Sequence, residues 1–137
     1  MELLERLRTA VTEVLAAVPE VAAAYLYGSH ARGKPLPTSD LDLALVLRTE
    51  TGSDDPLFAE RLASRIASAL DEPIEVDAHL AEDLPLPVRG RVVTSGVLLY
   101  EADPVRRVDF ETSTRRLYFD FLPLLERDAR EGIRARG

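Results

Sequence analysis

The chain reads VAAAYLYGS over residues 21–29 and, ten residues later, DLDLALVL over residues 40–47. The run from Val21 to Tyr27 is apolar at every position, which is typical of a strand that is buried on both faces of a sheet. Residues 41–47 form a second apolar run of strand length, with carboxylates at its start. The residues between the runs include KPLPTS, whose composition indicates a loop. The two stretches predict two buried strands connected by a turn and a loop.

Helical and strand patterns surround these two strands. Apolar residues at helical spacing, and apolar runs of strand length, predict the following elements. They are helices over residues 2–18, 57–70, 84–95 and from about 103 onward, strands over residues 74–80 and 97–100, and a short helical turn over residues 29–33. Pro123 predicts a kink in the last helix. The whole pattern predicts one α+β domain over residues 1–137, with a small mixed sheet and helices packed against it.

Composition excludes several classes of function. The 137 residues have a net charge of −7, whereas direct binding to a nucleic-acid backbone favours a basic face, so we expect no such binding. The chain has no cysteine, which excludes disulfides and thiolate metal sites. The start, MELLERLRTA, has acids where a signal peptide would have a basic region, and no apolar stretch is long enough to span a membrane. We therefore expect a cytoplasmic protein.

The turn after the first strand is suited to phosphate. Gly28 ends the strand and starts the turn, and glycine lets the backbone approach an anion closely. Amides at the start of a helical segment also favour anions. The Ser29 hydroxyl can donate one more hydrogen bond to a phosphate oxygen. We expect a phosphate group to bind here.

Two carboxylates begin the second strand. Asp40 and Asp42 are two residues apart, so their side chains share one face of an extended chain. Adjacent carboxylates repel each other unless a cation lies between them. Oxygen ligands together with a phosphate substrate favour Mg²⁺.

A third carboxylate can join if the strand over residues 74–80 lies beside the second strand. Asp77 and Glu75 are the two candidates, because they share a face by alternation. We favour Asp77 because we expect it nearer the carboxyl end of its strand. Three carboxylates could bind one or two metal ions and activate an attacking hydroxyl.

The segments YGSHARG (27–33) and SDLDL (39–43) resemble the DNA polymerase β-like nucleotidyltransferase superfamily. The resemblance is closer still to its minimal nucleotidyltransferases, the MntA-like antitoxins of HEPN/MNT toxin–antitoxin systems. Residues 76–77 and 96–100 also fit, so the resemblance spans roughly residues 21–118. It implies a polymerase β-like nucleotidyltransferase fold.

The resemblance also implies a role for each matching residue. Gly28 and Ser29 would hold the nucleoside triphosphate. The metal ligands would be Asp40, Asp42 and Asp77, the last as ligand or general base. Arg32, just past the turn, would neutralise phosphate charge, although a surface arginine paired with an acid is an equally good interpretation.

Members of this family often act as antitoxins that transfer AMP from ATP to a tyrosine of a HEPN-domain ribonuclease toxin. The resemblance therefore implies Mg²⁺, ATP and a HEPN toxin partner, with assembly into homo- or hetero-oligomers left open. Two alternatives remain: neutralisation of the partner by complex formation alone, and transfer to a small molecule such as an antibiotic. Only one helix follows the last predicted strand, so we expect the acceptor to come from another molecule or another subunit, and a protein acceptor fits this expectation.

For two further features, the sequence allows two interpretations each. His79 could orient the carboxylate of Asp77 or simply stand near the strand end, and we favour the latter. Tyr118, Phe119 and Phe121 cannot all face one core, so some of them either bind a partner or wrap around the edge of the sheet.

Overall fold

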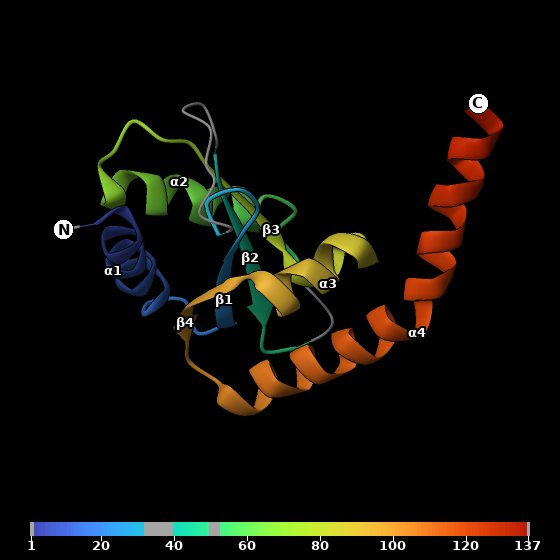
Figure 1. Cartoon of the computed structure of the whole chain (residues 1–137). Helices are drawn as coiled ribbons and strands as arrows, with labels where there is room; N and C mark the ends of the chain where they lie inside the picture. The colour runs from blue at the N-terminus through green and yellow to red at the C-terminus, as the bar shows by residue number, and fades with distance from the viewer. Residues whose placement is uncertain (1, 32–39, 50–52, 137) are drawn as a thin grey trace.

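The computed structural model describes residues 2–31, 40–49 and 53–136 (Figure 1). Within these ranges the chain forms four α-helices, one short 3-10 helix and a four-stranded sheet, which confirms the predicted α+β class. The elements are α1 (Leu3–Leu15), β1 (Val21–Tyr27), β2 (Leu41–Leu47), α2 (Phe58–Leu70), β3 (Val76–Leu80), η1 (Ala81–Asp83), α3 (Leu86–Ser95), β4 (Val97–Glu101) and α4 (Pro104–Arg136).

The sheet has the strand order β3-β2-β1-β4 and is mixed, as predicted. β1 is antiparallel to both β2 and β4, whereas β2 is parallel to β3. β1 and β2 are therefore the two central strands, and nearly every residue in them is buried. This pairing brings the end of β1 and the starts of β2 and β3 to the same end of the sheet.

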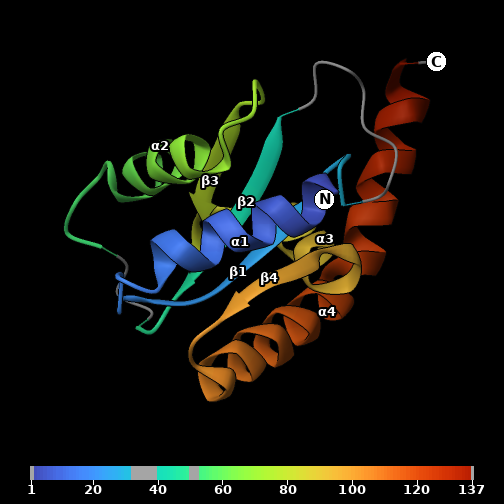
Figure 2. The ribbon, with the colours of Figure 1, turned by 90° about the vertical axis from the view of Figure 1, so that its left-hand side faces the viewer.

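Helices cover both faces of the sheet (Figure 2). Alternate residues of β2 enter two different cores, because successive side chains of a strand point to opposite faces. Leu43 and Leu45 pack with α1 and α2, and Ala44 and Val46 pack with residues of α3 and α4. No helix in the described residues has the length and apolar character needed to cross a membrane.

Several predicted boundaries were wrong. β3 starts at Val76 and not at residue 74, because the Ile74 N–H donates to the Glu72 carbonyl in a tight turn (2.8 Å). α3 starts at Leu86 and not at residue 84, since η1 and Pro85 precede it. α1 ends at Leu15, and the chain continues in turns up to β1.

The short helix predicted over residues 29–33 was also wrong where it is described. Residues 28–31 form a bend and a turn, and residues 32 and 33 lie outside the described residues. The expected kink is present: Pro123 lies inside α4, and Figure 1 shows the helix bending in its second half.

Arg106 fixes the first turns of α4 to the sheet. Its side chain is buried, and its Nε donates to the Leu47 carbonyl at the end of β2 (2.9 Å). Its guanidinium also pairs with Glu82 of η1 and with Asp109. A buried guanidinium needs such partners to offset the loss of hydration. One side chain therefore connects β2, η1 and α4.

We expect Arg106→Met to lower the free energy of unfolding by about 2 kcal/mol, because the Leu47 carbonyl and the acidic partners lose a charged donor. Arg61→Met is the matched control, because Arg61 is exposed and makes one surface ion pair with Asp55 (3.2 Å). It should cost less than about 1 kcal/mol. Urea unfolding measures both variants, and equal losses would contradict the role given to Arg106.

Candidate active site

Three strands bring a row of polar side chains to one end of the sheet. The antiparallel register places Tyr27, the last residue of β1, opposite Asp42 of β2. The parallel register places Asp77 of β3 on the other side of Asp42. Tyr27, Asp42 and Asp77 therefore lie side by side across β1, β2 and β3.

Gly28 follows β1 and lies directly against Asp42. Its φ is +79°, in the left-handed region that other residues rarely adopt. A Cβ atom added at this position would collide with Oδ2 of Asp42. The backbone of the turn can come this close to the carboxylate only because residue 28 is glycine. Ser29, predicted to contact phosphate, is the next residue of the same turn.

Negative charge is concentrated around Asp42. Burial raises the pKa of the Asp42 carboxyl, and the charges of Asp77 and Asp40 raise it further. Burial, together with the charges of Asp42 and Asp77, raises the pKa of Tyr27 to about 12. A cation between these carboxylates would relieve the repulsion.

The structure places Asp77 beside Asp42, but not for the reason given from the sequence. Asp77 lies at the start of β3 and not near its carboxyl end. It still meets Asp42, because β2 is parallel to β3 and both strands begin at this end of the sheet. Glu75 precedes β3, where its carbonyl accepts a hydrogen bond from the Leu41 N–H (2.9 Å). Its side chain is exposed.

His79 contacts Asp77. Its Nε2 lies 3.1 Å from Oδ2 of Asp77, and both side chains are about half exposed. The alternation of β3 puts the two residues on one face. The sequence already raised this contact as one of two interpretations. It did not give Tyr27 a place in the site, which needed the register between β1 and β2.

Two predicted site residues remain, Asp40 and Arg32. Asp40 is exposed and precedes β2, and its negative charge helps to raise the pKa of the Asp42 carboxyl. Arg32 lies outside the described residues. Among the residues that the structure describes, no three acids or histidines are grouped so that they could hold a metal ion by themselves.

This arrangement fits a metal ion that arrives with a phosphate ligand. Mg²⁺ is commonly bound by one or two carboxylates together with the phosphates of a substrate, and not by a complete cage of protein ligands. Asp42 and Asp77 are neighbouring oxygen donors, and the Gly28 turn lies against one of them. A phosphate at that turn would lie near the Asp42 carboxylate, and the two negative groups would repel each other unless a cation offset their charge.

Comparison with known protein families identifies the domain that carries this site. Residues 9–105 match the family described as polymerase beta, nucleotidyltransferase. The chain belongs to the polymerase beta nucleotidyltransferase family. The predicted membership of this superfamily is thus confirmed, and the chain contains a nucleotidyltransferase domain. A search of the curated proteins finds no match.

Solved structures share the fold of this nucleotidyltransferase. A chain from a toxin–antitoxin crystal structure with AMP-PNP matches with a TM-score of 0.72 and 23% identity, over 92% of this chain and 98% of that one. A structure of a tri-AMPylated Shewanella oneidensis HEPN toxin in complex with MNT antitoxin matches with a TM-score of 0.61 and 21% identity, with the same coverage. A structure described as a minimal nucleotidyltransferase matches with a TM-score of 0.53 and 27% identity, over 69% of this chain and 93% of that one.

A double-mutant cycle tests the contact between Gly28 and Asp42. Gly28→Ala alone should cost more than the roughly 1–2 kcal/mol expected for a left-handed backbone, because its Cβ also meets the carboxylate. In an Asp42→Ala background only the backbone cost should remain, so the second Gly28→Ala step should be smaller. Urea unfolding in EDTA gives both values, and identical values in the two backgrounds would show that the contact carries no energy.

Proposed function

We propose that the chain is a Mg²⁺-dependent adenylyltransferase that acts as an antitoxin by transferring AMP from ATP to a tyrosine of a HEPN-domain ribonuclease toxin. The observation that carries the proposal is the Gly28 turn lying against Asp42, with Asp77 beside it, in a nucleotidyltransferase domain. Structures with AMP-PNP and with a tri-AMPylated HEPN toxin support the choice of donor and acceptor. We place the reaction in the cytoplasm, which suits a chain without cysteine.

In this proposal the turn binds the triphosphate of ATP. The backbone at Gly28 approaches the phosphates, the Ser29 hydroxyl donates a hydrogen bond, and Arg32 neutralises part of the charge. Asp40, Asp42 and Asp77 would hold Mg²⁺ together with the phosphates of ATP. When bound, Mg²⁺ supplies positive charge to the phosphate oxygens as the reaction proceeds.

The acceptor is a tyrosine hydroxyl from outside this chain. Its oxygen attacks the α-phosphorus of ATP, and the bond from that phosphorus to the oxygen shared with the β-phosphate breaks. Pyrophosphate leaves, and the hydroxyl proton passes to a carboxylate. We assign this proton to Asp77, because its side chain is half exposed and can be reached by an acceptor from solution, whereas Asp42 is more buried.

Conservative amide variants test this assignment. Asp42→Asn and Asp77→Asn should each lower the rate of AMP transfer by about 10²-fold or more, because a preorganised charge at the reacting phosphate is lost. Glu75→Gln is the matched control and should stay within a few-fold of the wild type. The readout is the mass of one AMP added to the toxin, measured by intact-protein mass spectrometry with and without EDTA.

Two outcomes would contradict parts of the proposal. Wild-type protein that adds no AMP to its HEPN partner would overturn the transfer reaction and favour neutralisation by complex formation. An active Asp77→Asn variant together with an inactive Glu75→Gln variant would make Glu75 the third carboxylate.

His79 offers a test of how Asp77 is held. His79→Ala should raise the Mg²⁺ concentration needed for half the maximal rate by a few-fold, because Asp77 loses a neighbour that restrains its carboxylate. His79→Gln keeps a hydrogen-bond donor and should restore much of the wild-type value. A metal titration of the transfer rate compares the two, and two indistinguishable variants would show that the contact positions nothing.

A further inference from the structure

The buried face of α4 continues into a part of the helix where apolar side chains are exposed. Arg106, Phe110 and Thr114 are buried against the rest of the protein. Leu117, Phe121 and Leu124 follow at intervals of three and four residues, so they lie along the same side of the helix. Their side chains are 43%, 45% and 51% exposed. We call these three residues the α4 stripe.

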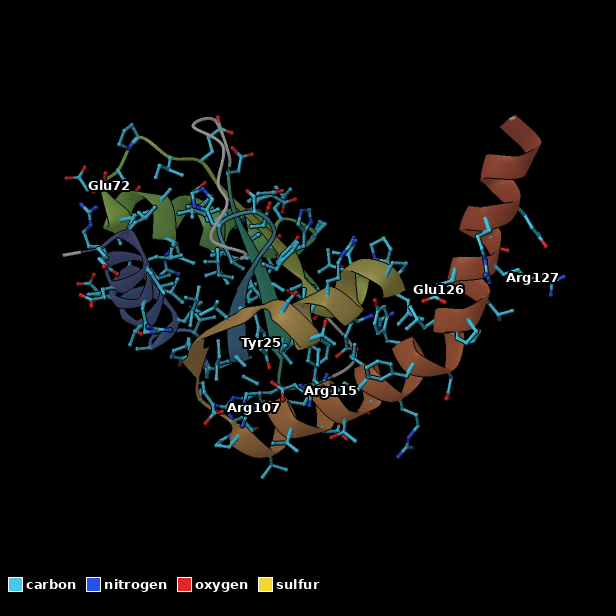
Figure 3. All side chains as sticks on the ribbon, in the orientation of Figure 1. Tyr25, Glu72, Arg107, Arg115, Glu126 and Arg127 are labelled. Atoms are coloured by element: carbon cyan, nitrogen blue, oxygen red, sulfur yellow. The ribbon has the colours of Figure 1, made fainter. Side chains whose placement is uncertain are left out.

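The described contacts of α4 with the body end near the start of this stripe. The ring of Tyr118 packs over Gly90 of α3, where an added Cβ would collide with it. Arg115 donates to the Val93 carbonyl at the end of the same helix (3.4 Å). Beyond these residues α4 stands away from the other elements, and Figure 3 places Glu126 and Arg127 on this free part.

The family domain ends where α4 begins. The match to the nucleotidyltransferase family covers residues 9–105, and α4 starts at Pro104. The minimal nucleotidyltransferase structure matches only 69% of this chain. The fold that carries the carboxylates is therefore defined without most of α4, which leaves this helix available for another purpose.

The relatives found in toxin–antitoxin complexes share α4. Their matches cover 92% of this chain, whereas α4 is 33 of the 137 residues, or about a quarter. The unmatched part is shorter than α4, so the shared fold must include most of this helix. Chains that assemble with a toxin thus have a long last helix in common with this chain.

The free part of α4 also extends toward the end of the molecule that carries the candidate site. In both Figures 1 and 2 it rises to the height of the sheet end where β1 stops and β2 starts. This is the end that carries Gly28, Asp42 and Asp77. A protein that binds the α4 stripe and extends along the rest of the helix therefore reaches the level of the carboxylates.

We propose that the α4 stripe is the docking surface for the acceptor protein, which presents an apolar groove between its helices. The proposal rests on the proposed function, because that function supplies a helical protein acceptor. An amphipathic helix with anchors at intervals of three and four residues is a common ligand of such grooves. Residues 115–137 contain six arginines and four acids within an acidic chain, so the rim of the groove should be acidic.

Charge substitutions on two faces of the helix give the test. Phe121→Asp disrupts the α4 stripe, and Phe119→Asp is the matched control, because Phe119 is 56% exposed and two residues away on another face. Binding to the HEPN toxin is measured by calorimetry without ATP or Mg²⁺. Phe121→Asp, and separately Leu124→Asp, should weaken binding by about tenfold or more, with Phe119→Asp within about threefold.

Kinetics and solution mass complete the experiment. With ATP and Mg²⁺ present, Phe121→Asp should raise KM for the toxin and leave kcat unchanged, because docking far from the reacting atoms is uniform binding. Circular dichroism melting establishes that each variant is folded. Light scattering gives the mass of the chain alone, which should be that of a monomer.

Each outcome bears on one proposal. Unchanged toxin binding by Phe121→Asp and Leu124→Asp, or equal weakening by Phe119→Asp, would overturn the docking surface even if AMP transfer is observed. A wild-type dimer that Phe121→Asp dissociates would make the α4 stripe an interface between two copies of this chain. A stable complex without AMP transfer would leave docking standing and overturn the transfer reaction.

Discussion

The site depends on the pairing of β1 with β2, because this pairing sets the Gly28 backbone against the Asp42 carboxylate. Two antiparallel central strands place the last residue of one opposite the first residues of the other. The parallel pairing of β2 with β3 then adds Asp77 from the other side. Two registers thus bring together residues that are 14 and 35 positions apart in the sequence. Helices on both faces hold these registers, since a shift by one residue would turn every core side chain of β2 toward the wrong core.

The sequence was a good guide to the parts of the fold that local chemistry controls. Runs in which both odd and even positions are apolar predicted β1 and β2 with the correct first and last residues. The glycine that ends one run and Asp42 near the start of the other, both predicted as site residues, lie together at one end of the sheet. These signals are strong because a run that is apolar at every position and ends on glycine fits few structures other than a buried strand followed by a turn.

Features set by tertiary pairing were beyond the sequence. Alternation allowed both Glu75 and Asp77, and only the parallel register shows that Asp77 is the neighbour of Asp42. The predicted start of β3 was wrong because the backbone makes a turn at Ile74, so strand pairing begins only at Val76. The side-chain pattern does not reveal such a turn. The periodicity of α4 likewise predicted a helix with one apolar side. It could not distinguish the portion of α4 whose side chains are buried against the body from the portion whose apolar side chains are exposed.

The contact between Gly90 and Tyr118 has a mechanical consequence. Here the Tyr118 ring of α4 packs against α3, so a shift of this contact would tilt the rest of the helix. From Tyr118 to Leu124, the last residue of the α4 stripe, the helix extends about 9 Å at 1.5 Å per residue, so a tilt of about 5° at Tyr118 moves Leu124 by about 1 Å. A displacement of about 1 Å between reacting groups can cost a reaction 10²-fold in rate. The absence of a side chain at Gly90 would thereby affect how accurately a protein bound to the α4 stripe is placed.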